Sequence, residues 1–235
     1  MGTKEGAMGR FRASAREVGA AVRSGVKMAL RGRYGERRRG LNPSYLTEQQ
    51  SSKAPTIFLH GDFHNATAFY TLSERLRDHG VGPLYVIEYS DLEDGLAQID
   101  ALLGQIQTHY ARWDVHDVAV NLVGHSMGGI VAAEFMRRSP EKVRKVITVG
   151  SRLKPVGAIT FAYKKSRDVI AGLYRWLDEH RARLPLYNIA AGRDWLVPQE
   201  AALAGCPTRQ TVVEGTSHLS VLYAKETTDR IASLL

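Results

Sequence analysis

The chain has 235 residues, a hydrophobic fraction of 44% and a formal net charge of +8 at pH 7. That length suits one folded domain with an appendage, and the hydrophobic content is typical of a soluble globular protein. Residues 1–53 contain 12 Lys or Arg and 4 Asp or Glu, so the remaining 20 basic and 20 acidic side chains of 54–235 cancel. A neutral main body without a recognition motif argues against nucleic-acid binding.

Cysteine usage and hydropathy bear on the compartment. Cys206 is the single cysteine, which excludes an intramolecular disulfide, and no Cys/His cluster has the spacing of zinc ligands. We therefore expect a reducing, cytoplasmic environment. No apolar stretch approaches the roughly 18 residues that cross a bilayer, and the N-terminus lacks the apolar centre of a secretory signal.

The basic segment 10–40 contains two rows of side chains with i+4 spacing, one apolar and one cationic. The rows are Val18, Val22, Val26 and Leu30, and Arg23, Lys27 and Arg31. This pattern predicts a short amphipathic helix that could hold the protein peripherally on an anionic membrane surface, and a solvated leader is the alternative. A mitochondrial transit peptide fits less well, because such peptides avoid acids and this segment contains Glu17 and Glu36, although organellar import stays open.

A polar linker, residues 41–55, follows the leader, so we place the domain boundary between 1–53 and 54–235. From Thr56 onward, short apolar runs alternate with amphipathic stretches, which predicts an α/β fold with about six mostly parallel strands and helices on both faces. The clearest helix is expected over 95–113. The predicted strands are 56–60, 84–89, 118–124, 143–150, 184–191 and 209–214.

The stretch "VGHSMGG", residues 123–129, separates the third predicted strand from a helix. It matches the G-x-S-x-G nucleophile elbow, in which a serine lies at a sharp strand-to-helix turn and the flanking glycines Gly124 and Gly128 leave room for the backbone. The strand and the helix around it supply the context that a bare five-residue match lacks. Ser126 is therefore the candidate nucleophile.

A serine hydroxyl needs a neighbouring base to accept its proton, and that base needs an acid to orient it. In this architecture both should follow the serine, each just past the carboxyl end of a strand. Asp194 follows the fifth predicted strand and His218 follows the sixth. The other histidines precede the serine, adjoin it, or fall in or beside helices, and Glu200 and Glu214 lack the loop context of Asp194.

Acyl transfer also needs two backbone N–H donors for the oxyanion. One should be the N–H of Met127, the residue after the nucleophile. The other should come from the loop after the first strand, "LHGDFHN", where Asp62 or Phe63 would provide it. Asp62 is unusual beside a developing negative charge, so its side chain would have to point away from the site. An ordinary strand-to-helix loop is the alternative.

The motifs "FLHGDF", "VGHSMGG", "GRDWLVP" and "GTSHLSVL" together resemble the α/β-hydrolase superfamily, and within it the small serine lipases and esterases, across about residues 55–235. The resemblance implies an acyl-enzyme on Ser126, with His218 as general base and Asp194 holding the imidazole. It implies no metal or organic cofactor.

The stretch between the fourth and fifth strands, residues 151–183, is where this superfamily inserts lids and specificity elements. It is too short for a large cap domain, so we expect a small insertion with one helix. Its apolar part, 155–163, could wall an acyl-binding groove through Val156, Ile159 and Phe161, or could be a packed loop. An open site of this kind would suit a small-molecule or lipid ester.

Three functions stay open at this point. The first is a serine carboxylic-ester hydrolase of the lipase or esterase type. The second is a thioesterase or amidase of the same superfamily, which differs in leaving group. The third is a non-catalytic α/β-hydrolase-fold binding protein, which is disfavoured because the serine, acid and histidine positions are all filled.

Overall fold

The computed structural model describes residues 47–62, 64–155 and 167–235. The predicted amphipathic helix of the leader lies outside these residues. So do Phe63 and the predicted groove wall at 156–161.

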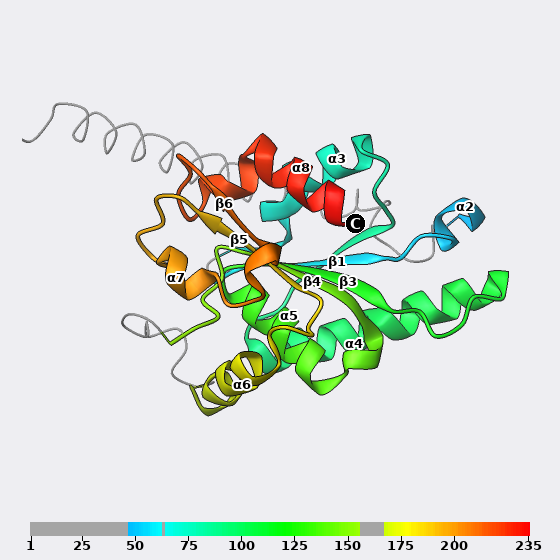
Figure 1. The fold of residues 1–235 in the computed structure, drawn as a ribbon. Coiled ribbons are helices and arrows are strands. Elements are labelled where there is room, and N and C mark those ends of the chain that lie inside the picture. Colours follow the sequence, from blue (N-terminus) through cyan, green and yellow to red (C-terminus); the bar gives the residue numbers. More distant parts are fainter. Residues whose placement is uncertain (1–46, 63, 156–166) are drawn as a thin grey trace, which may run out of the picture.

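Six strands form one sheet, in the order β2-β1-β3-β4-β5-β6, and every neighbouring pair is parallel (Figure 1). This architecture confirms the predicted α/β class. The strands are β1 (Thr56–Leu59), β2 (Leu84–Ile87), β3 (Val120–His125), β4 (Val143–Val149), β5 (Leu186–Ala191) and β6 (Gln210–Val213).

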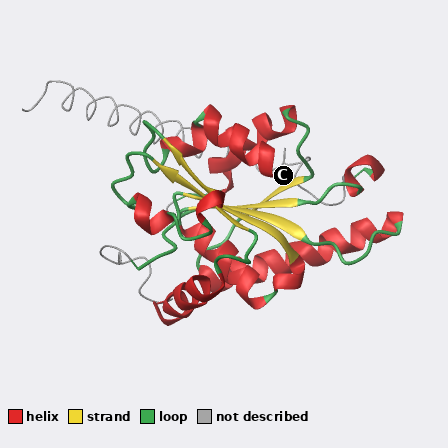
Figure 2. Cartoon of the chain, in the orientation of Figure 1, coloured by secondary structure: helices red, strands yellow, loops and turns green. Residues whose placement is uncertain are grey.

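Helices cover both faces of the sheet, as the apolar character of the strands predicts (Figure 2). One face packs on α4 (Leu92–Tyr110), α5 (Met127–Arg138) and α6 (Arg167–His180), and the other on α3 (Tyr70–Asp78) and α8 (Lys225–Leu234). Two short helices, α2 (Glu48–Ser51) and α7 (Gln199–Ala202), precede β1 and follow β5. The 3-10 turns are η3 (Ala66–Phe69), η4 (Ala111–Trp113), η5 (Pro140–Lys142), η7 (Pro207–Arg209) and η8 (Ser220–Tyr223).

Helix α4 shows how the sequence sets one of these elements. Its carboxylate cap, Asp91, accepts a hydrogen bond of 3.0 Å from the Asp94 amide, which satisfies one of the free N–H groups of the first turn. The helix expected over 95–113 thus runs from Leu92 to Tyr110, and its apolar side chains at helical spacing are buried: Leu96, Ile99, Leu103, Ile106 and Tyr110. Within the described parts of the chain, no helix combines the length and the apolar character that a membrane span requires.

A buried polar side chain in β5, Asn188, connects this strand to β4 and to the loop that follows α7. Asn188 in β5 is 1% exposed; its amide donates to the Thr148 hydroxyl at 2.9 Å and accepts from the Gly205 amide at 2.8 Å. Both bonds are made out of contact with water, so losing the side chain leaves the Gly205 amide without its partner.

We therefore expect Asn188→Ala to lower the free energy of unfolding by about 1–3 kcal/mol. Asn121→Ala in β3 is the matched control, because Asn121 is equally buried but donates only one long hydrogen bond, 3.4 Å to Thr56. Urea unfolding followed by circular dichroism measures both losses. Equal losses in the two variants would contradict the role given to Asn188.

Candidate active site

Ser126 lies between the last residue of β3 and the first residue of α5. Its backbone has φ 54° and ψ −120°, a conformation that side-chain-bearing residues rarely adopt and that costs of order 1–3 kcal/mol. The Ser126 amide donates to the Val149 carbonyl at 3.0 Å, which ties the turn to the end of β4. The sequence pattern predicted a sharp strand-to-helix turn, and the structure has one here.

The elbow glycines are required by close packing. A Cβ atom on Gly124 would lie 2.3 Å from the backbone of Gly128, and one on Gly128 would lie 2.1 Å from the Leu59 carbonyl oxygen. Real Cβ atoms do not approach backbone atoms this closely, so any side chain would force α5 away from the sheet. The glycines thus bring the start of the helix directly against the end of β1.

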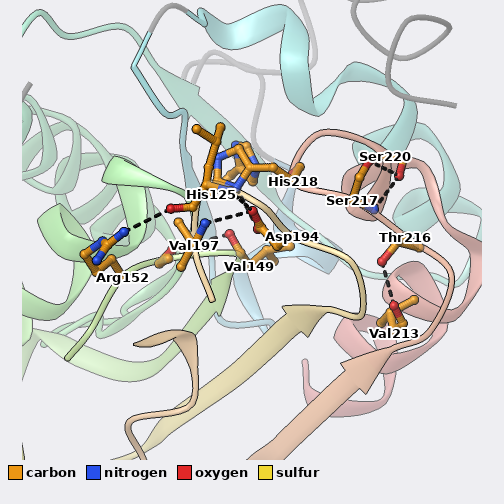
Figure 3. Close-up of polar contacts among 12 residues, drawn as sticks. His125, Val149, Arg152, Asp194, Val197, Val213, Thr216, Ser217, His218 and Ser220 are labelled. Atoms are coloured by element: carbon orange, nitrogen blue, oxygen red, sulfur yellow. Dashed lines mark hydrogen bonds and ion pairs between the residues drawn. The ribbon is translucent and has the colours of Figure 1, made fainter. Parts of the chain in front are cut away.

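Asp194 and His218 come from the loops after β5 and β6 and meet in a hydrogen bond of 2.8 Å between Oδ2 and Nδ1 (Figure 3). The two side chains are 1% and 6% exposed. The other carboxylate oxygen, Oδ1, accepts from the amides of Leu196 at 2.9 Å and Val197 at 2.8 Å. The carboxylate is thereby fixed on both sides, and it holds the imidazole by Nδ1, which leaves Nε2 as the nitrogen that can exchange a proton.

Two serines fix the turn that carries His218, and the sequence reasoning did not identify them. Ser220 Oγ accepts from the Ser217 amide at 2.8 Å, and the two hydroxyl oxygens are 2.7 Å apart (Figure 3). The Thr216 hydroxyl donates to the Val213 carbonyl at 2.6 Å, and the Arg193 amide donates to the Thr216 carbonyl at 2.8 Å. The acid loop and the histidine loop are therefore bonded to each other through the backbone as well as through the Asp194–His218 pair.

His125, directly before the nucleophile candidate, connects the elbow to His218. Its Nε2 donates to the His218 carbonyl at 2.9 Å, and the two ring centroids are 4.8 Å apart. A carbonyl oxygen only accepts, so the proton must be on Nε2. Burial, with repulsion from His218 and His64, holds the pKa of His125 well below its usual value of 6.5, so the ring is neutral. The bond places the His218 turn beside Ser126.

The turn after β1 lies against the elbow. The His64 amide donates to the Gly61 carbonyl at 3.2 Å, and a Cβ atom on Gly61 would lie 2.7 Å from the Ser126 Cβ. Asp62, at the start of this turn, is therefore next to the nucleophile candidate, and the surrounding protein raises the pKa of its carboxyl by desolvation, against an opposing contribution from His60. Phe63, the alternative donor, lies outside the described residues, and Met127 is the first residue of α5.

Histidines that the sequence reasoning set aside also lie at this edge of the sheet. The His64 ring stacks on His125 with centroids 5.7 Å apart, and desolvation together with the nearby His218 and His60 lowers the pKa of His64 to about 4. His60 Nε2 lies 3.4 Å from a carboxylate oxygen of Glu88, at the end of the neighbouring strand. β1 and β3 pair in the sheet, so the carboxyl ends that carry these histidines meet, and the sequence alone does not state that pairing.

The remaining candidates lie elsewhere. Glu214 packs against Gly192 and Glu200 lies in α7, whereas the carboxylate beside His218 belongs to Asp194. Across the described residues, no group of three or more His, Cys, Asp or Glu side chains is arranged to hold a metal ion. The site therefore consists of a serine at a strained turn, a neutral histidine, and a carboxylate–histidine pair.

Comparison with solved structures finds the same fold in many proteins. A monoacylglycerol lipase from Paleococcus ferrophilus is 13% identical, with a TM-score of 0.57 and coverage of 77% of this chain and 95% of that one. An esterase from Pyrobaculum calidifontis is 16% identical, with a TM-score of 0.59 and coverage of 77% and 74%. The 2-hydroxy-6-oxo-6-phenylhexa-2,4-dienoate hydrolase of a Rhodococcus strain is 14% identical, with a TM-score of 0.51 and coverage of 77% and 89%.

At these identities the likeness shows the fold alone, and the three proteins differ in the activity that their names give. A search of curated protein sequences found no match. The sequence model of the alpha/beta hydrolase family matches residues 56–233, which include every strand and all the site residues described above. The chain belongs to the alpha/beta hydrolase family.

Proposed function

We propose that the protein is a serine hydrolase of carboxylic esters, and that its substrates are lipid-like. The observation that carries this proposal is the position of Ser126 at a strained strand-to-helix turn, tied through His125 to the turn that carries the Asp194–His218 pair. Lipases and esterases among the structural neighbours support the ester chemistry.

The reaction follows from the proton positions. His218 donates a hydrogen bond from Nδ1–H to Asp194 and keeps that proton, so its Nε2 is free to accept the proton of Ser126 as Oγ attacks the ester carbonyl. The N–H of Met127, with that of Asp62 or Phe63, would stabilise the oxyanion of the tetrahedral intermediate. His218 then returns its proton to the leaving alcohol, which departs and leaves the acyl group on Ser126. Water, deprotonated by His218, attacks the acyl-enzyme; the bond from Ser126 Oγ to the acyl group then breaks, His218 returns the proton to Oγ, and the acid is released.

His125 contributes by staying neutral. A second imidazolium in contact with His218 would disfavour the cationic His218 that forms when the serine loses its proton. The low pKa of His125 removes this repulsion at neutral pH, while its Nε2 keeps the bond to the His218 carbonyl.

Ser126→Ala and His218→Ala should each lower kcat on a p-nitrophenyl ester by about 10⁴-fold or more, because the nucleophile and its base act as a unit. Ser126→Ala should also abolish covalent labelling by a fluorophosphonate. Two surface variants serve as controls, Ser233→Ala on α8 and His116→Ala in the loop after α4, and both should keep full activity. Wild-type protein that does not label at Ser126 would overturn the enzyme proposal and favour a non-catalytic binding protein.

Asp194→Asn should lower kcat by about 10³- to 10⁴-fold with little change in KM, because the amide no longer accepts the Nδ1 proton and the imidazole loses its orientation. Asp178→Asn on α6 is the control, since the one ion pair of Asp178 within the described residues is with Arg181, at 3.5 Å on the surface. Glu214→Gln tests the competing acid. A larger loss in Glu214→Gln than in Asp194→Asn would assign the acid's role to Glu214.

The leaving group separates the ester hydrolase from the thioesterase and the amidase. Matched acyl esters, thioesters and anilides, each in a series of chain lengths, give kcat/KM for the three classes. We expect the ester to be preferred, with kcat/KM rising with chain length. A higher kcat/KM for the thioester or the anilide at every chain length would replace the ester proposal.

A further inference from the structure

The loop that carries Asp194 also exposes two apolar side chains. Trp195 and Leu196 are 74% and 38% exposed, and they follow the acid directly. Tyr70 is the one other exposed large hydrophobic side chain among the described residues, so two of three are adjacent on this loop. Single exposed apolar side chains are common on protein surfaces, whereas adjoining ones form a patch of the kind that contacts a partner or a membrane.

Hydrogen bonds fix the backbone of this loop, and the fixed backbone directs the side chains of Trp195 and Leu196 into solvent. The Leu196 amide donates to Asp194 at 2.9 Å, and the Leu196 carbonyl accepts from the guanidinium of Arg152 at 2.9 Å. Arg152 is itself 5% exposed. The next residue, Val197, turns inward and packs with Ala201 and Ala202. The same turn that aims Asp194 at His218 therefore keeps Trp195 and Leu196 in solvent.

We infer that Trp195 and Leu196 insert into an anionic lipid surface and place the Ser126 site against the esters it contains. The choice of a lipid as partner rests on the proposed ester hydrolysis. An indole ring combines apolar area with a polar N–H, and tryptophan is enriched at membrane–water interfaces for that reason. The basic N-terminal segment, with 12 Lys or Arg against 4 Asp or Glu in residues 1–53, supplies the complementary charge.

The small apolar area that Trp195 and Leu196 expose favours a lipid surface over a folded protein as the partner. One aromatic side chain buries about 150–250 Å², whereas a stable protein interface buries about 800 Å² on each partner. Two apolar side chains are too few for the latter. Peripheral membrane binding needs only a small apolar insertion, because electrostatic attraction to the headgroups adds to it.

The test measures binding separately from catalysis. The full-length chain carrying Ser126→Ala is titrated with phosphatidylcholine vesicles, with and without phosphatidylglycerol, and binding is measured by sedimentation. Trp195→Ala should weaken binding to the anionic vesicles by about tenfold or more. Trp113→Ala is the matched control, because Trp113 lies in η4 after the far end of α4, and it should bind as the parent does.

Fluorescence reports the insertion itself. The chain has three tryptophans, so Trp113→Phe and Trp176→Phe leave Trp195 as the single emitter. Its emission should shift to shorter wavelength when anionic vesicles are added. Replacing Arg23, Lys27 and Arg31 by glutamine should weaken vesicle binding by about tenfold or more.

The inference is overturned if Trp195→Ala binds as tightly as the parent, or if the protein sediments with vesicles while the Trp195 emission stays unchanged. It is also overturned if Trp195 emits at short wavelength before any lipid is added, because another part of the chain or a second copy would then cover it. Vesicle binding without fluorophosphonate labelling of the wild type would overturn the proposed hydrolase and leave the lipid surface standing.

Discussion

The backbone at Ser126, with φ 54° and ψ −120°, is tolerated because β1, β3 and α5 pack together without intervening side chains. Gly128 lies against the Leu59 carbonyl at the end of β1, and Gly124 lies against Gly128. The β1–β3 register pairs Leu59 with Gly124, so the contacts that close the sheet against the helix also hold the half-buried Ser126 at the turn between them. The strain is a local cost, and the burial of the surrounding strands and helix offsets it.

The carboxylate–histidine pair is connected to that turn by hydrogen bonds between loops. His125 bonds the His218 carbonyl, His218 bonds Asp194, and Arg193 bonds the Thr216 carbonyl. Three strand ends thus form one network, and each group arrives already oriented. Groups that are already oriented need no rearrangement when charge develops in the transition state. In the proposed reaction this preorganisation would lower the free energy of the transition state. The neutral state of His125 belongs to the same arrangement, since it keeps a second positive charge away from His218.

The acid loop illustrates how one backbone conformation has two effects. Asp194 accepts hydrogen bonds from two amides of its own loop, and this turn directs its carboxylate inward. The residues that supply the turn, Trp195 and Leu196, are left outside the core. Exposing a tryptophan forgoes the roughly 1.5–3 kcal/mol that burying a large apolar side chain contributes, and contact with a lipid surface would recover part of it.

The amino-acid sequence alone predicts the α/β class, about six mostly parallel strands and the helix over 95–113, because the periodicities of strands and helices are local features of the chain. It also determined the elbow, since glycines around a serine between a strand and a helix have few other uses. The folded structure adds three facts: His125 donates a hydrogen bond to the His218 turn, Ser217 and Ser220 stabilise that turn, and Trp195 is exposed to solvent. These contacts join residues from the ends of different strands or depend on the conformation of a loop. The spacing of residues along the sequence predicts neither of these. Strand order and the packing of α5 against the sheet bring them together.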